Sequence, residues 1–403
     1  MTRTEKKGAG AMLAGKSTVV ITGATGFLGS HIMASMLEKG RRVIVLGRPS
    51  QKEPLRDRVE KLLRWFGITW PTGRLYTVES DFLKPRCGLP PERYAELCAA
   101  TDQIIHCASD TSFFERGRAR VFESNVGCLK ELLEFASASG VSFFHYVSTA
   151  YAAGLVTGLC PEKLPAASGF TNVYEESKAL AEKVVTGYCS ENSIPLNILR
   201  PSIVYGDSVT GRALKFNALY LPVKSLAHIR DIYLNDIINH GGKKSRECGI
   251  RLGAAGRLLL PLRIYLPKSG SVNLVPVDYF VRTALSIIEK TSHGGIYHIT
   301  TDAPSPPETL VAFAERFLNI CGVEIVCGNS YNKIMRNPPE ELFNRFIEPY
   351  RPYMSDGRSF ERKNTDAATG GASVPACSYE TFGRCMEFAV AADWGGRVLD
   401  TGQ

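Results

Sequence analysis

The sequence has no apolar run long enough to cross a membrane and no closely spaced pair of cysteines. Its 403 residues contain no stretch of about eighteen consecutive apolar residues, so no transmembrane helix is expected. The eleven cysteines form no Cys-x-x-Cys pair, and the seven histidines show no metal-ligand spacing. This pattern predicts buried, unpaired thiols in a reducing compartment, taken to be the cytoplasm, and it predicts no metal site.

Residues 1–16 carry basic residues followed by a short, glycine-rich apolar stretch. The stretch is only marginally long enough for a signal peptide, and a strand pattern begins immediately behind it. We therefore expect a flexible tail. The rest of the chain, with 44% hydrophobic residues over the whole sequence, has the composition of an ordinary globular protein.

A glycine-rich turn follows the first apolar run, Val19–Ile21. The segment Thr22–Gly29 reads Thr-Gly-Ala-Thr-Gly-Phe-Leu-Gly. Gly23 allows a sharp turn from strand to helix, Gly26 leaves room for a pyrophosphate, and Gly29 lets the helix pack closely on its strand. The pyrophosphate would lie on unpaired N–H groups at the positive end of the helix.

The flanking elements support a dinucleotide site. Leu28, Ile32 and Met36 recur every four residues, Gly40 ends that helix, and Arg42–Leu46 forms a second strand. The result is a complete βαβ unit, which is much stronger evidence than three glycines alone. The alternative is a glycine-rich turn with no ligand. The predicted contacts here are Gly23, Thr25, Gly26, Phe27, Leu28 and Gly29.

The residue after the second strand indicates which dinucleotide is bound. An NAD site usually has Asp or Glu there to bind the ribose hydroxyls, whereas this chain has Arg48. A guanidinium suits the 2′-phosphate of NADPH, and Arg58 follows nearby. The sequence therefore favours NADPH, with a solvated loop cation as the alternative reading of Arg48.

Strand and helix patterns alternate over the first two thirds of the chain, which predicts a doubly wound, Rossmann-type parallel sheet. The expected cofactor domain covers 17–207, with a strand returning near 271–300. The remaining segments, 208–270 and 301–403, are expected to form a smaller, mostly helical substrate-binding or lid region. Further elements are expected at 58–66 (helix), 75–79 (strand), 103–107 (strand), 121–136 (helix), 142–147 (strand), 174–189 (helix), 196–199 (strand), 306–320 (helix) and 378–391 (helix).

One segment carries the whole positive excess of the chain. Residues 211–270 contain eleven Lys and Arg but three Asp and Glu, an excess equal to the net charge of +8. Apolar stretches such as Leu258–Leu262 predict a lid or tunnel wall among these cations. Such a surface would suit acyl-CoA, an acidic acyl-carrier protein or an anionic membrane face. A solvated basic face is the alternative, and no nucleic-acid motif accompanies the charge.

Tyr174 and Lys178 lie four residues apart on a predicted helix, so they share one face. A nearby ammonium, with the charge of the oxidised nicotinamide close by, stabilises a phenolate and should lower the pKa of Tyr174 toward the working range. Ser148 and Thr149 end a predicted strand at the sheet edge where ligands bind, and Thr149 would donate to a substrate oxygen. Asn125 would orient a water or the helix beside the nicotinamide. Surface pairing and strand-end capping are the alternatives for these residues.

With these residues assembled, the chain resembles the extended short-chain dehydrogenase/reductases, and most closely the thioester reductase and fatty acyl-CoA reductase branch. The resemblance covers about Ser17 to Thr300. The motifs that carry it are Thr22–Gly29, Asp81-Phe82, Val147-Ser148-Thr149-Ala150-Tyr151, Tyr174-x-x-x-Lys178, Arg200–Asp207 and Val275-Pro276-Val277-Asp278-Tyr279.

The resemblance implies further cofactor contacts. Asp81 and Phe82 would contact the adenine. Around the nicotinamide and its ribose it implies Cys107, Ala108, Ser109, Pro201, Ser202 and Val204. Two departures concern the substrate: Cys107-Ala108-Ser109 replaces the usual Asn-Ala-Ala, and the tail after Thr300 has no clear match to the long-chain reductases.

The expected activity is NADPH-dependent reduction of an acyl thioester to the aldehyde or on to the alcohol, with Thr149, Tyr174, Lys178 and Ser148 as the catalytic set. The sequence leaves open the acyl chain, its delivery by CoA or carrier protein, and the oligomeric state. The alternatives are a ketone or alcohol dehydrogenase, a nucleotide-sugar epimerase or dehydratase, and a non-enzymatic NADP-binding scaffold or redox sensor.

Overall fold

A computed structural model describes residues 18–165, 169–253, 256–328 and 336–398. Its centre is a seven-stranded sheet with the strand order β12-β7-β5-β4-β1-β2-β3, and every neighbouring pair is parallel. The predicted doubly wound fold is confirmed. The strands are β1 (Thr18–Thr22), β2 (Arg42–Gly47), β3 (Leu75–Glu79), β4 (Thr101–His106), β5 (Phe143–Val147), β7 (Leu196–Pro201) and β12 (Gly295–Ile299).

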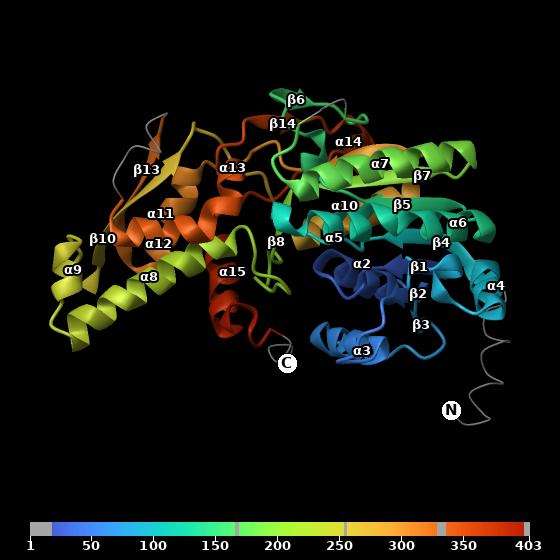
Figure 1. The fold of residues 1–403 in the computed structure, drawn as a ribbon, viewed down its shortest axis with the longest axis horizontal. Helices are drawn as coiled ribbons and strands as arrows, with labels where there is room; N and C mark the ends of the chain where they lie inside the picture. The colour runs from blue at the N-terminus through green and yellow to red at the C-terminus, as the bar shows by residue number, and fades with distance from the viewer. Residues whose placement is uncertain (1–17, 166–168, 254–255, 329–335, 399–403) are drawn as a thin grey trace.

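Helices cover both faces of this sheet because alternate strand residues point to opposite sides. Val19 and Ile21 of β1 belong to one apolar cluster, and Val20 belongs to another. The first cluster is shared with α2 (Phe27–Glu38), α3 (Leu55–Trp65) and α10 (Val277–Lys290). The second is shared with α4 (Pro91–Ala100), α6 (Leu129–Ser139) and α7 (Val173–Glu191). Figure 1 shows these layers on the right of the molecule.

The helix predicted at 121–136 is not continuous. It is divided into α5 (Arg118–Phe122), a π-helical turn (Glu123–Gly127) and α6. Asn125 lies inside the π turn with its side chain buried. Such turns insert one extra residue into a helix and commonly occur at functional sites. Apolar spacing could not reveal this one, because the helical pattern continues on both sides of it.

A second lobe, on the left of Figure 1, is built around another apolar cluster. Its sheet has the order β13-β10-β9, so this region is less purely helical than predicted. Its elements are α8 (Tyr220–Asn239), α9 (Lys243–Glu247), β9 (Arg251–Leu252), β10 (Leu258–Leu266), α11 (Pro307–Leu318), β13 (Ile320–Cys327), α12 (Pro338–Ile347), α13 (Arg351–Met354) and α15 (Tyr379–Ala391). Ser378 caps α15, as the sequence suggested.

The lid predicted at Leu258–Leu262 is wrong. These residues open strand β10, and Leu258, Leu260 and Leu262 are fully buried in the core of the second lobe. Pairing with β13 gives this apolar run a partner in a sheet. Burial at every second residue is the pattern of a strand with one face in the core.

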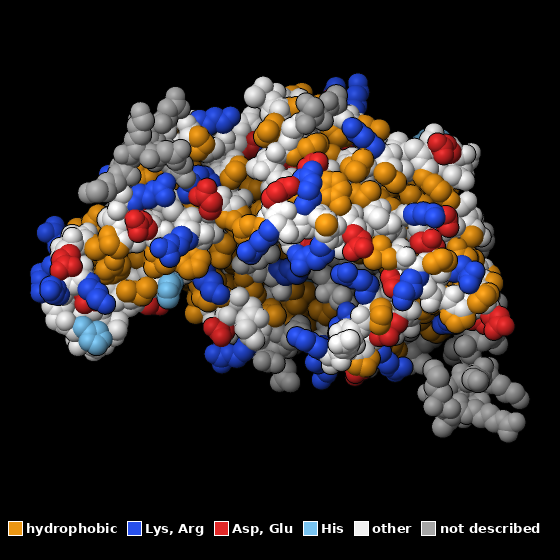
Figure 2. All heavy atoms as spheres, in the orientation of Figure 1, with side chains coloured by type: hydrophobic (Ala, Val, Ile, Leu, Met, Phe, Trp, Pro, Cys, Tyr) orange, Lys and Arg blue, Asp and Glu red, His pale blue; other side chains and the backbone are white. Residues whose placement is uncertain are grey.

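The positive residues of 211–270 are dispersed. The Arg212 guanidinium lies 4.1 Å from the Trp65 ring, Arg257 donates to the Ile320 carbonyl, and Arg263 pairs with Glu340 at 2.6 Å. On the face shown in Figure 2, basic side chains gather at the α9 end and, separately, over the middle of the molecule. Several of these charges thus hold local structure, and they do not form one stripe.

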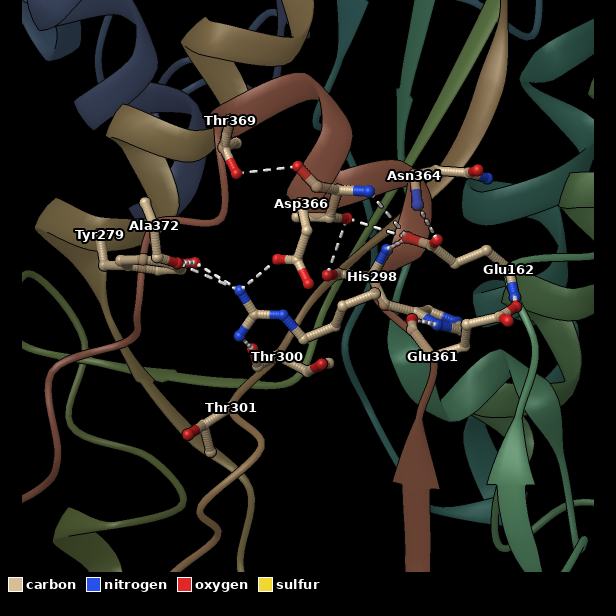
Figure 3. A network of polar contacts seen from close by, with 12 residues as sticks. Glu162, Tyr279, His298, Thr300, Thr301, Glu361, Asn364, Asp366, Thr369 and Ala372 are labelled. Carbon is tan, nitrogen blue, oxygen red and sulfur yellow. Dashed lines mark hydrogen bonds and ion pairs between the residues drawn. The ribbon is translucent and has the colours of Figure 1, made fainter.

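The C-terminal segment returns from the second lobe to the first. Strand β14 (Arg358–Phe360) pairs with β6 (Gly158–Cys160), and α14 (Lys363–Thr369) follows it. The buried Glu162 carboxylate accepts hydrogen bonds from the backbone N–H groups of His298 and Asn364 (Figure 3). Arg362 donates to the Thr300 carbonyl at 2.6 Å. Residues 358–372 therefore lie on the sheet domain, inside the range that was predicted to belong to the substrate region.

Strands β8 (Ile203–Tyr205) and β11 (Leu274–Pro276) pair where the lobes meet. The tail predicted at 1–16 lies outside the described residues. Within the described part of the chain, no helix combines the length and apolarity needed to cross a bilayer. All eleven cysteines are unpaired; five are buried, five are partly buried and Cys327 is exposed, which corrects the expectation that they are all buried.

Candidate active site

A cleft of about 570 Å³ opens at the carboxyl ends of the central strands. This is the edge at which parallel α/β sheets bind ligands, and the volume is within the usual range of about 300–1,000 Å³ for ligand sites. It is lined by every predicted site residue except Asn125: Gly23, Thr25, Gly26, Phe27, Leu28, Gly29, Arg48, Arg58, Asp81, Phe82, Cys107, Ala108, Ser109, Ser148, Thr149, Tyr174, Lys178, Pro201, Ser202 and Val204.

The turn between β1 and α2 requires glycine at two positions. Gly23 has φ of +70°, and a Cβ there would lie 2.5 Å from the Ala108 nitrogen. A Cβ on Gly29 would lie 2.4 Å from the Gly23 carbonyl oxygen. Gly26, the N-cap of α2, has no side chain to cap the helix, and the first turn of α2 contains no acidic residue. The first-turn N–H groups therefore fit the phosphates of a dinucleotide.

Two arginines stand where the adenosine ribose would lie. Arg48 follows β2 and is exposed, and the Arg58 side chain donates to the Arg48 carbonyl oxygen at 2.6 Å. The buried Nε of Arg58 has no hydrogen-bond partner among the described residues. This arrangement fits a phosphate group, since a guanidinium can offer it several donors.

The two hydroxyls after β5 face the same cleft. Thr149 Oγ1 donates to the Pro201 carbonyl and accepts from the Tyr151 N–H, both at 3.4 Å. These contacts are long for hydrogen bonds, so the hydroxyl can turn toward a ligand at small cost. Ser148 Oγ is buried and forms no hydrogen bond within the described chain. A buried polar atom of this kind fits a ligand oxygen in the cleft.

The first half of α7 supplies the phenol and the ammonium. Asn172 caps α7 by accepting a hydrogen bond from the Glu175 N–H, so Tyr174 lies in the first turn and Lys178 in the second. Lys178 Nζ donates to the Val147 carbonyl at 2.6 Å and lies 4.2 Å from the centre of the Tyr146 ring. The sheet therefore holds the ammonium at the floor of the cleft.

The pKa of Tyr174 differs from the prediction. Burial raises the pKa of Tyr174 above its ordinary value, the Glu175 carboxylate adds to the rise, and Lys178 does not offset it. Burial also lowers the pKa of Lys178 to about 8. The predicted lowering for Tyr174 is wrong for the protein by itself, because removal from water outweighs the ammonium. A phenol with a raised pKa is a proton donor at neutral pH.

The chemistry of the cleft thiol argues against a nucleophilic role. Burial raises the pKa of Cys107 to about 12, so this thiol stays protonated near neutral pH. The neighbouring His106 accepts or donates a hydrogen bond with Thr22 at 2.7 Å, and burial lowers the pKa of His106 to about 3. Without a thiolate or a base able to form one, Cys107 fits a wall position. The hydroxyls, the phenol and the ammonium are the groups that suit chemistry on a carbonyl at this place in the cleft.

Asn125 lies behind the cleft wall. Its side-chain oxygen accepts hydrogen bonds from the Ser109 hydroxyl and the Asp110 N–H, and its nitrogen donates to Asp110 and to Ser177 on α7. The side chain thus joins the loop after β4 to the helix that carries Tyr174. Its position suits orientation of that loop and helix more than direct contact with a cofactor.

Asp81 and Phe82 lie after β3. Asp81 accepts a hydrogen bond from the Leu83 N–H and pairs with Lys84, and Phe82 is buried. On the opposite wall, Ser202 Oγ is buried without a hydrogen-bond partner in the described chain. Both ends of the cleft therefore combine an apolar surface with polar groups.

Several cleft residues were missed by sequence reasoning. The second lobe contributes Lys215, Asn217 and Ala218, and the loop and π turn before α6 contribute Thr111 and Ser124. They belong to no recognisable motif, and the place of Lys215, Asn217 and Ala218 depends on how the second lobe packs on the first. Of these residues, the positive charge of 211–270 gave a signal in the sequence for Lys215 only.

The fold and the cleft define an NAD(P)-binding oxidoreductase of the extended short-chain dehydrogenase/reductase class. The NAD-binding family described as Male sterility protein matches residues 21–284, which is more than half of the chain. The chain belongs to this family.

Two fungal synthetases are among its relatives. Hybrid PKS-NRPS synthetase fsa1 of Fusarium sp. (strain FN080326) is 33% identical over 162 residues, covering 39% of this chain and 4% of that protein. Iterative polyketide synthase afoE of Emericella nidulans (strain FGSC A4 / ATCC 38163 / CBS 112.46 / NRRL 194 / M139) is 25% identical over 305 residues, covering 70% of this chain and 10% of that protein. The chain thus spans a small part of the length of either relative.

Solved structures share the fold over nearly the whole chain. The terminal R domain from the myxalamid PKS-NRPS pathway has a TM-score of 0.71 at 21% identity, covering 94% of this chain and 92% of that one. A thiolation-reductase di-domain from an archaeal non-ribosomal peptide synthetase has a TM-score of 0.69 at 16% identity, covering 95% and 78%.

Proposed function

We propose that this chain reduces an acyl thioester to an aldehyde with NADPH. One observation carries the proposal: the glycine turn, Arg48, and the set Ser148, Thr149, Tyr174 and Lys178 all line one cleft. The relatives add support, since one similar structure is a terminal R domain of a PKS-NRPS pathway and another is a thiolation-reductase di-domain.

The cofactor would lie at the carboxyl ends of β1 and β4, the topological switch point where the strand order changes direction. The N-terminus of α2 would hold the pyrophosphate, and Arg48, supported by Arg58, would hold the 2′-phosphate. Bound NADPH supplies a hydride. Arg48 in the position of the usual acidic residue is the feature that favours NADPH over NADH.

The hydroxyls bind and polarise the substrate carbonyl. Thr149 and Ser148 would donate to the thioester oxygen, which becomes an oxyanion when the hydride reaches the carbonyl carbon. Tyr174, kept protonated by its raised pKa, would donate a proton to that oxygen and give a hemithioacetal. Collapse of the hemithioacetal breaks the C–S bond and gives the aldehyde; the hydroxyl proton returns to the Tyr174 phenolate, and the departing thiolate takes a proton from solvent and leaves as the thiol.

Lys178 holds positive charge below the reacting groups. Its ammonium is tied to the Val147 carbonyl, directly before Ser148 and Thr149, so it would stabilise the oxyanion and any phenolate at Tyr174. The same residues would serve a second round on the aldehyde, which consumes a second NADPH and gives the alcohol. The partner would be a thioester on coenzyme A or on an acyl-carrier protein.

The test follows NADPH oxidation with a panel of acyl-CoA and acyl-carrier-protein thioesters while thiol, aldehyde and alcohol are quantified together. The expected result is one thiol released per aldehyde formed, with two NADPH consumed per alcohol. NADPH oxidation with ketones but no thiol release would indicate an alcohol dehydrogenase. Conversion of a nucleotide sugar without net NADPH use would indicate an epimerase. Either outcome would overturn the proposal.

A further inference from the structure

The second lobe contains a separate apolar cavity of about 70 Å³. It lies inside the cluster formed by α8, α11, α12 and α15, with α13 at one side. Its wall includes Leu226, Val311, Ala314, Phe343, Met354 and Phe382. None of these side chains carries a hydrogen-bonding group apart from the weakly accepting Met354 sulfur.

The polar atoms in the wall are already used elsewhere. The Tyr353 hydroxyl donates to Glu175 Oε1 at 2.7 Å and accepts from Asn172 Nδ2 at 2.8 Å. Burial raises the pKa of Tyr350, and the backbone of Ala218 beside its hydroxyl partly offsets that rise. A water held in this cavity would therefore lack the two to four polar partners that buried waters need. The cavity suits an apolar guest.

The cavity adjoins the cofactor cleft. Ala218 lines both spaces, and Ile203 of the cavity wall lies between Ser202 and Val204 of the cleft wall. The Phe113 ring stands at the same junction, 6.0 Å from Tyr174 and 5.8 Å from Tyr353 between ring centres. The cavity and the cleft therefore share a wall at Ala218 and at residues 202–204, close to the Tyr174 ring.

We propose that this cavity binds the apolar end of the substrate acyl chain and selects it by length. The inference rests on the proposed thioester reduction. The volume is several times the roughly 10–15 Å³ that one water-sized group needs, so it takes a segment of a few carbons. Val311, on α11, is a partly buried wall residue at which a larger side chain would fill the space.

The test measures KM and kcat for straight-chain acyl-CoA thioesters of two to twelve carbons. In the wild type, 1/KM should rise by roughly fourfold for each methylene that enters the cavity, and then level off. Val311→Phe should abolish that rise and leave kcat for the shortest thioester unchanged. The matched control is Val390→Phe on α15, whose side chain is half exposed outside the cavity and should keep the wild-type series.

A binding measurement separates this inference from the proposed chemistry. Straight-chain alcohols of four to ten carbons are titrated into the NADPH-loaded protein by calorimetry, which needs no turnover. The wild type should bind longer alcohols more tightly, Val311→Phe should lose this dependence on length, and Val390→Phe should keep it. That result supports binding of the chain in the cavity even if no thioester is reduced. Affinity independent of length, or identical in both variants, overturns it.

A second inference rests on hydrogen bonds rather than on the cavity. We infer that Tyr353 is a positioning residue for Tyr174. Its hydroxyl joins Asn172, the N-cap of α7, to Glu175, one residue after Tyr174. Glu175 is fully buried and also accepts from the Thr171 N–H. A residue of the second lobe thus holds the turn of helix that presents the phenol to the cleft.

The test is Tyr353→Phe, which keeps the ring and removes both hydrogen bonds. We expect kcat to fall roughly tenfold, with KM for a short thioester and the Kd of NADPH unchanged, because the proton donor is misplaced. The control is Tyr188→Phe, near the other end of α7. An unchanged kcat, or a loss of kcat that Tyr188→Phe reproduces with an equal fall in melting temperature, would refute the positioning role.

Discussion

The cleft of the sheet domain and the apolar cavity of the second lobe differ in the residues that line them. The cleft of the sheet domain is lined by a glycine turn, hydroxyls and cations, whereas the cavity of the second lobe is lined almost entirely by aliphatic and aromatic side chains. Backbone and short polar groups suit a ligand of constant structure with phosphates. Apolar walls suit a ligand recognised by size and shape. The difference in lining fits the proposal that the sheet domain holds the cofactor and the second lobe selects the substrate.

The largest effect on kcat is expected when the proton donor is removed from the cleft. Tyr174→Phe should lower kcat by about 10²–10⁴ while NADPH binding stays the same, because the cleft keeps every phosphate contact. Stopped-flow turnover and cofactor fluorescence measure the two quantities. Tyr188→Phe on the same helix is the control and should keep wild-type kcat. Full turnover in Tyr174→Phe would remove the phenol from the mechanism.

Cofactor choice should belong to the sheet domain alone. Arg48→Ala should raise KM for NADPH by roughly 10- to 100-fold, the loss expected for hydrogen bonds to a charged group, and leave KM for NADH nearly unchanged. Steady-state kinetics with both nucleotides tests this. Arg56→Ala, which removes an exposed arginine stacked on Trp70 outside the cleft, is the matched control. Equal losses for both nucleotides would contradict a 2′-phosphate role.

The buried ammonium predicts two opposite pH effects. Burial lowers the pKa of Lys178 to about 8, so kcat should fall about tenfold per pH unit above that value as the charge is lost. The unfolded chain binds this proton up to its ordinary pKa of 10.5, so folding stability should rise with pH between about 8 and 10.5. Denaturation of Lys178→Met across this range should lack the rise. A flat kcat profile to pH 9.5 would show that the lysine charge is not needed.

The smallest effect concerns delivery of the anionic substrate. Lys215 lines the cleft, while Lys243 and Lys244 lie on α9 at the far end of the second lobe (Figure 1). Lys215→Glu should raise KM for acyl-CoA by a few-fold, with the increase reduced at high salt, because rim charges act mainly through steering. The double change Lys243→Glu and Lys244→Glu is the control and should shift KM by less than about twofold. A larger rise in KM for the double change on α9 than for Lys215→Glu would indicate that α9 guides the substrate.

Much of the sheet domain could be predicted from local patterns. The strands predicted at 75–79 and 142–147 and the turn at Thr22–Gly29 follow from spacing and glycine placement, and in the second lobe the cap at Ser378 follows from side-chain chemistry near in sequence. The cleft residues around Tyr174 and Lys178 were also found, because helical spacing and strand ends place them at one sheet edge.

The second lobe was less predictable. Strand β10 was interpreted as a lid, because an apolar run does not by itself show that it pairs with another strand. Its partner β13 lies more than fifty residues later. The positive excess of 211–270 predicted a single surface, yet Arg212, Arg257 and Arg263 are engaged in local structure.

The parallel sheet, the glycine turn after β1 and the grouping of hydroxyls, phenol and ammonium could be predicted from the amino-acid sequence, because periodicity and backbone conformation are properties of neighbouring residues. Only the tertiary structure decided the raised pKa of Tyr174, the joining of Tyr353 to the first turn of α7, and the apolar cavity beside Ala218. Burial, desolvation and enclosed volume arise when distant segments pack together, and no local pattern encodes them.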